Sequence, residues 1–124
     1  MKEIKAYIRR DEVDQVVEKL EGAGAPGVAI IQIHPIGYGY EPNAFQPLSA
    51  GLVRRHRHLA IVKLEIFCAD AQVESLLGVI CDYCSTGNPG DGMIFVSEVV
   101  DAVRIRDGVR GAGALRLTLT TPAA

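Results

Sequence analysis

Apolar and polar positions alternate near the N-terminus in a way that predicts a strand followed by an amphipathic helix. Ile4, Ala6 and Ile8 share one face of an extended segment that begins at Lys2. Helical spacing then takes over, with apolar residues at Val13, Val16, Val17 and Leu20. Asp11 is the candidate N-cap of this helix, and the glycine- and proline-rich segment 22–27 ends it.

The same patterns continue along the rest of the chain and are interrupted by one long segment without any period. Residues 28–33 are β-branched and predict a second strand, and residues 61–68 alternate and predict a third. Asp70 is the candidate N-cap of a second helix, whose apolar positions are Val73, Leu76, Leu77 and Ile80. The fourth strand is expected to run from Met93 to about Arg106. Between the second and third strands, residues 36–60 form a loop long enough to suggest a functional role.

This order of elements predicts an α+β fold, a ferredoxin-like βαββαβ sandwich with both helices on one face of an antiparallel sheet. We expect a single domain over residues 1–124, with a C-terminal tail from residue 107. If the other sheet face is apolar, a second subunit is the expected cover in so short a chain.

Composition and charge narrow the function classes. The net charge of −2 predicts no general affinity for nucleic acid or for an anionic membrane surface. No apolar run is long enough for a membrane span, and no signal-peptide pattern occurs at the start of the sequence. We therefore expect a cytoplasmic protein without membrane insertion.

The segment 86–92, between the second helix and the fourth strand, carries the clearest functional pattern. Gly87, Gly90 and Gly92 allow a ligand to approach the backbone, and their N–H groups favour an anion-binding concavity. If the fourth strand reaches Arg106, alternation places Arg104 and Arg106 on one face, where guanidinium groups suit phosphate oxygens. The sequence therefore predicts a phosphate site, although surface arginines paired with nearby carboxylates are the simpler alternative.

The run from Thr86 to Val96, the Arg104-Ile105-Arg106 triplet and the segment 62–66 together resemble the nitrogen regulatory P-II family of signal-transduction proteins. The resemblance spans nearly the whole domain. It implies a ferredoxin-like homotrimer that binds an adenine nucleotide (ADP, AMP or ATP) in the clefts between subunits. It implies a regulator, not an enzyme, with no catalytic residues. It also implies that the 36–60 loop docks onto a membrane transporter or a metabolic enzyme.

Carried over position by position, the resemblance implies a set of nucleotide-binding residues. They are Gly37, Tyr38, Gly39, Glu65, Gly87, Gly90, Asp91, Gly92, Met93, Arg104 and Arg106. Met93 and Tyr40 stand where the family usually has a lysine and an arginine. The loss of these donors leads to the hypothesis that the site is weak for ATP and relatively better for ADP or AMP. A small anion such as bicarbonate is a candidate additional ligand.

The cluster at residues 54–58 is the densest group of basic residues in the chain. Arg54, Arg55 and Arg57 are candidates for contact with an anion or an acidic partner, and His56 and His58 are weaker candidates for metal ligands. A solvated loop end is the alternative. These residues support a second hypothesis for function, a metal- or anion-responsive trimeric scaffold that has lost nucleotide sensing.

Cys81 and Cys84 form a C-x-x-C sequence at the end of the second predicted helix. Redox-active pairs usually lie at a helix N-terminus, which lowers the pKa of the thiol. We therefore favour packing in the helix over redox or metal chemistry for this pair.

Overall fold

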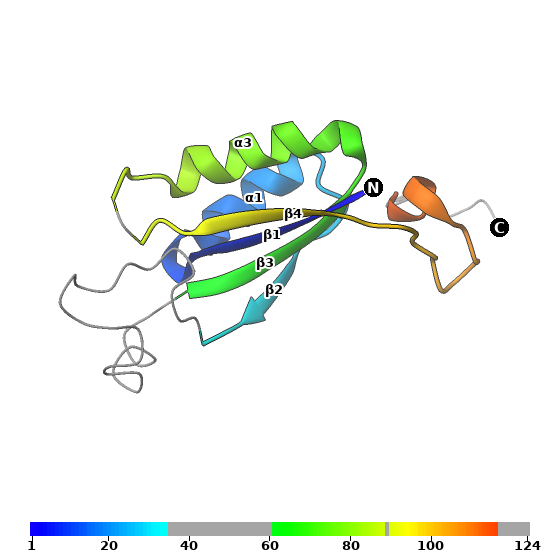
Figure 1. Ribbon diagram of the computed structural model, residues 1–124, viewed down its shortest axis with the longest axis horizontal. Coiled ribbons are helices and arrows are strands. Elements are labelled where there is room, and N and C mark those ends of the chain that lie inside the picture. The colour runs from blue at the N-terminus through cyan, green and yellow to red at the C-terminus, as the bar shows by residue number, and fades with distance from the viewer. Residues whose placement is uncertain (35–60, 89, 117–124) are drawn as a thin grey trace.

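The sheet of the protein has four strands in the order β2-β3-β1-β4, and every pairing is antiparallel (Figure 1). The structure is a computed structural model that describes residues 1–34, 61–88 and 90–116. The strands are β1 (Lys2–Arg9), β2 (Ala29–Gln32), β3 (Ile61–Cys68) and β4 (Met93–Glu98). The helices are α1 (Val13–Gly22) and α3 (Val73–Cys84), with short 3-10 helices η1 (Arg10–Glu12), η2 (Asp70–Gln72) and η3 (Gly111–Leu115).

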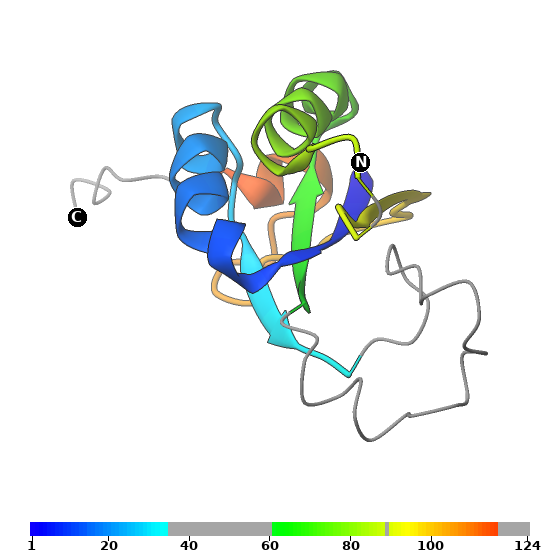
Figure 2. The same ribbon diagram turned by 90° about the vertical axis from the view of Figure 1, so that its left-hand side faces the viewer.

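Both helices cover the same face of the sheet, and the core lies between them and the strands (Figure 2). Alternate residues of β1 and β3 point into it, including Ile4, Ile8 and Leu64. The helices contribute the apolar positions at helical spacing, with Val16 and Leu76 among the fully buried ones. The ferredoxin-like α+β fold is therefore confirmed. Burial follows the period of two in β1 and β3 and of about 3.6 in the helices.

The predicted N-caps are wrong at both helices. Asp11 lies inside η1 and Asp70 inside η2, and no side chain caps the first turn of α1 or α3. A 3-10 turn separates each strand from its helix and moves the helix start by about three residues. Before α3, the Gln72 side chain instead accepts the N–H of Ala69 at 3.1 Å and donates to the Gly24 carbonyl at 2.9 Å.

The fourth strand is shorter than predicted, because its partner ends. β4 pairs with β1 only as far as Glu98, which lies opposite Lys2 at the start of β1. The chain then leaves the sheet and forms a small hairpin, with an isolated bridge between Val103 and Arg110. The premise that a long strand places Arg104 and Arg106 on one face is therefore wrong.

The sheet face away from the helices is neither fully apolar nor fully polar. Lys63 and Glu65 form an ion pair at 2.8 Å on it, and Tyr7 meets Phe95 edge-to-face with ring centroids 5.8 Å apart. Beyond β4, Val100 and Ile105 are 99% and 100% exposed. The segment after Glu98 thus presents apolar side chains that the described part of the chain leaves uncovered.

No helix in the described part of the chain is long and apolar enough to cross a membrane.

Candidate functional site

The Asp91 carboxylate organises the glycine-rich turn from within. It accepts the backbone N–H of Thr86 at 2.7 Å and of Gly87 at 2.9 Å, and also the Thr86 hydroxyl. These bonds lower the pKa of Asp91 to about 2, and the bond from the Thr86 hydroxyl has the largest effect on that pKa. The carboxylate therefore already accepts a hydrogen bond from the N–H of Gly87, which the sequence analysis assigned to a ligand phosphate.

Three glycines of the turn adopt positive φ, and one of them permits a close contact within the fold. Gly87, Gly90 and Gly92 have φ values of 80°, 95° and 117°. A Cβ on residue 92 would lie 2.0 Å from the carbonyl oxygen of Tyr7, whereas a Cβ on residue 87 would meet no atom within 4 Å. At Gly92 the close approach is therefore between the turn and β1.

Arg9, the last residue of β1, also contacts the turn, and the sequence analysis did not identify it. Its Nη2 donates to Oδ1 of Asp91 at 2.8 Å. A Cβ on residue 90 would lie 3.7 Å from the same nitrogen. No motif includes Arg9, because its contact with the turn spans 82 positions of the sequence. Only the pairing of β1 with β4 brings the two together.

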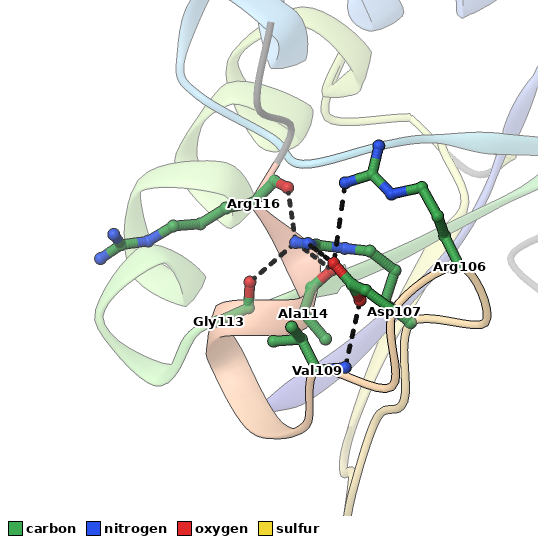
Figure 3. A network of polar contacts seen from close by, with 7 residues as sticks. Arg106, Asp107, Val109, Gly113, Ala114 and Arg116 are labelled. Atoms are coloured by element: carbon green, nitrogen blue, oxygen red, sulfur yellow. Dashed lines mark hydrogen bonds and ion pairs between the residues drawn. The ribbon is translucent and has the colours of Figure 1, made fainter. Parts of the chain in front are cut away.

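Arg104 bonds to Asp107 in its hairpin and to carbonyls of the segment 113–116 that follows, and these partners are labelled in Figure 3. Its Nη1 donates to the Asp107 carboxylate at 2.9 Å. Its Nη2 lies 3.0–3.3 Å from three carbonyl oxygens, those of Gly113, Ala114 and Arg116. Arg106 differs, because its side chain is 64% exposed and its ion pair with Asp107 is long, at 3.7 Å. The two arginines therefore have different environments, although the sequence treated them as a pair.

The two halves of the predicted site lie at opposite ends of the sheet (Figure 1). The turn adjoins Arg9 at the end of β1, whereas the hairpin with Arg104 and Arg106 begins beyond Glu98, opposite the start of β1. The eight residues of β1 span roughly 23 Å at about 3.3 Å per step. A small ligand therefore cannot contact the turn and the hairpin of the same chain at once.

The remaining predicted residues are distributed as follows. Glu65 lies in the middle of β3, paired with Lys63, and Met93 is the first residue of β4, 48% exposed. Six loop residues lie outside the described part of the chain, as do two histidines of the same loop. They are Gly37, Tyr38, Gly39, Arg54, Arg55, Arg57, His56 and His58. Within the described ranges there is no group of three or more His, Cys, Asp or Glu residues that could hold a metal ion.

The two cysteines of the C-x-x-C sequence line a cavity of about 340 Å³ between the end of α3 and the start of β4. Cys81 is exposed and Cys84 is buried. Burial raises the pKa of the Cys84 thiol to about 11, which keeps it protonated at neutral pH. This environment suits a packed thiol, the interpretation that the sequence favoured.

Comparison with known proteins gives a consistent result. The family model described as nitrogen regulatory protein P-II matches residues 1–109. A nitrogen fixation nifHD region GlnB-like protein 1 of Methanothermococcus thermolithotrophicus is 38% identical over 111 residues, 90% of this chain and 99% of that protein. A nitrogen regulatory protein P-II of Cereibacter sphaeroides is 35% identical over 93% of this chain and 100% of its own. A crystal structure of Arabidopsis thaliana PII bound to citrate superposes with a TM-score of 0.70 at 30% identity, covering 97% of this chain and 94% of that one.

Replacement of Gly92 should be more destabilising than replacement of Gly87. Both substitutions to alanine place a Cβ at positive φ, at a cost of about 1–2 kcal/mol. Gly92→Ala also forces that Cβ against the Tyr7 carbonyl, which should lower the free energy of unfolding by about 2 kcal/mol more. Urea denaturation of the two variants measures the difference, and equal losses would contradict the close contact.

Asp91 should make stability depend on pH in the acid range. Its pKa in the folded state, about 2, lies below the ordinary value near 3.9 in an unfolded chain. The contribution to stability is therefore present above about pH 5 and is lost as the pH falls toward 2. Asp91→Asn should reduce stability at pH 7 and flatten the decline between pH 5 and pH 2. Thermal unfolding across this range is the measurement, with exposed Asp14→Asn on α1 as the control.

Removal of the Arg104 side chain should loosen the segment that it holds. Arg104→Ala removes the guanidinium that donates to the carbonyls of Gly113, Ala114 and Arg116, so trypsin should cleave faster after Arg110 and Arg116. We expect roughly a tenfold increase in rate, the equivalent of losing about 1.4 kcal/mol of local stability. Arg106→Ala is the matched control. An equal increase in that variant would contradict the role of the Arg104 bonds in holding the segment.

Proposed function

The chain belongs to the nitrogen regulatory protein P-II family, and on that premise we propose that it is a signal-transduction regulator that binds an adenine nucleotide between copies of itself. The nucleotide is ADP, AMP or ATP, with bicarbonate as a candidate additional ligand. Its occupancy controls a membrane transporter or a metabolic enzyme through the 36–60 loop.

The main observation in support of a shared site is the separation of its two halves. The turn lies at one end of β1 and the hairpin beyond the other, so a ligand that needs both must lie between two chains. Such a contact joins different surfaces of the two copies, and repeated contacts of this kind form a ring when the rotation from one copy to the next closes. Since the P-II resemblance implies a trimer, we propose that this ring has three copies.

The exposed apolar segment after β4 supports the same assembly. Val100, Val103 and Ile105 are at least half exposed in the single chain. They lie on the part of the chain that carries Arg106, so a neighbouring copy that covers them would also bring its own turn toward this arginine. Burial of these side chains would add a hydrophobic contribution to assembly.

Arg106 is the better candidate for contact with phosphate. Its guanidinium is largely exposed and has one distant acceptor. Arg104, in contrast, would have to break its hydrogen bonds to three carbonyls and a carboxylate before it could bind phosphate. We therefore assign Arg106 to the ligand and Arg104 to the support of the hairpin.

The roots of the 36–60 loop lie near the turn. β2 ends at Gln32 opposite Val62, and β3 begins at Ile61 opposite Arg9, whose side chain contacts the turn. A ligand at the turn is thus placed to shift the balance between loop conformations, and a partner that prefers one of them would respond.

The alternative, a metal- or anion-responsive scaffold without nucleotide sensing, has its own support. The N–H of Gly87 and the guanidinium of Arg104 are both engaged inside the chain, and Met93 supplies no charge. A nucleotide titration separates the two functions.

Calorimetric titration with ATP, ADP and AMP, each with and without magnesium and bicarbonate, should show micromolar binding. Arg106→Ala should weaken it about tenfold or more, because a hydrogen bond to a charged group contributes about 1.5–3 kcal/mol. Arg110→Ala, which removes an exposed arginine of the same hairpin, is the matched control. Absence of binding under every condition would favour the scaffold.

Mixing two defective variants tests whether the site is shared. Met93→Glu places a carboxylate beside the turn, and Arg106→Ala disables the hairpin. In rings refolded from an equal mixture, about a quarter of the clefts combine an intact turn with an intact hairpin and should bind. If the mixture bound no more than either variant alone, the site would not lie between copies.

A further inference from the structure

The turn has a negative charge at its centre. The Asp91 carboxylate is ionised at neutral pH, since four donors lower its pKa to about 2. An approaching phosphate would meet repulsion from this carboxylate unless a cation balances it. Residue 93, the first after the turn, is an exposed methionine and provides none.

Arg9 is the cation in contact with the turn. Its side chain is 29% exposed, and Nη2 is 2.8 Å from Oδ1 of Asp91. A guanidinium has five N–H donors in a planar fork, and one bond to Asp91 leaves others for a second anion. Within the described residues, Asp91 is the one acceptor that Arg9 contacts.

Gly90 leaves the guanidinium open to a ligand. With φ of 95°, residue 90 would point a Cβ to within 3.7 Å of Nη2 of Arg9. That distance is ordinary contact, so an atom in the space above Gly90 touches the arginine. The missing side chain therefore creates a position where a ligand oxygen meets both the backbone of the turn and Arg9.

We propose that Arg9 is a binding residue for the phosphate groups of the nucleotide, held in place by Asp91 and reached across Gly90. This assignment rests on the proposed nucleotide site and adds a cation to its glycine-rich half, where the described residues place no other in contact with the turn. Asp91 acts through Arg9 and through the N–H of Thr86 and Gly87, so it positions both the charge and the backbone.

The test is calorimetric titration with ADP of the full chain and four variants. Arg9→Met should weaken binding by about 10- to 150-fold, because a hydrogen bond to a charged group contributes about 1.5–3 kcal/mol. Arg9→Lys should retain part of the affinity, since it keeps the charge but loses the planar fork. Arg10→Met is the matched control, because this neighbouring arginine is bonded to Gln32 on β2 and should leave the affinity unchanged.

The fourth variant separates a contact with the ligand from a merely structural role. Arg9→Met combined with Met93→Lys returns a cation to the exposed position after the turn, without restoring the bond to Asp91. Recovery of at least tenfold in affinity would support a direct role toward phosphate. No recovery, with unchanged unfolding temperature in Arg9→Met, would overturn it.

The outcomes also distinguish this assignment from the proposed function. Binding by the unmodified protein that Arg9→Met leaves unchanged would overturn only the role of Arg9. Absence of ADP, ATP and AMP binding by the unmodified protein would overturn both.

Discussion

The pairing of β1 with both β3 and β4 is the constraint on which the rest of the structure depends. β1 lies inside the sheet, so its two ends fix where neighbouring segments stop pairing. At its start, β4 has no further partner beyond Glu98 and the chain turns into the hairpin. At its end, Arg9 reaches the turn and Tyr7 meets the backbone of Gly92. One strand thus places both halves of the candidate site, and its length separates them.

Within one chain, the charged groups of the candidate site largely satisfy one another. Asp91 accepts hydrogen bonds from backbone N–H groups and from Arg9, and Arg104 donates hydrogen bonds to backbone carbonyls and to Asp107. These contacts give each half a defined shape before any ligand arrives, which lowers the ordering that binding requires. They also limit which groups remain available to a ligand. For this reason Arg106 and Arg9 are better candidates for contact with phosphate than Arg104 and the N–H of Gly87.

Sequence patterns located the elements well but their ends poorly. The apolar periodicity of the core is a local property, so both helices and all four strands could be predicted, along with the face that β1 and the two helices bury. The helix starts and the end of β4 depend on 3-10 turns and on the length of a partner strand, neither of which is visible in a local pattern. The same limit explains the error on Arg104 and Arg106, which were placed on a strand that does not extend so far.

The sequence by itself determined the ferredoxin-like fold, the P-II family and the glycine-rich turn, because all of these follow from residue types at fixed spacing. Tertiary structure alone decided which groups face one another. It brought Arg9 to Asp91 across the sheet, assigned Gly92 to the contact with Tyr7, turned Arg104 back onto its own hairpin and set the two halves of the site at opposite ends of β1. The physical reason is that these relations join residues far apart in the chain or depend on strand register, which only the folded sheet fixes.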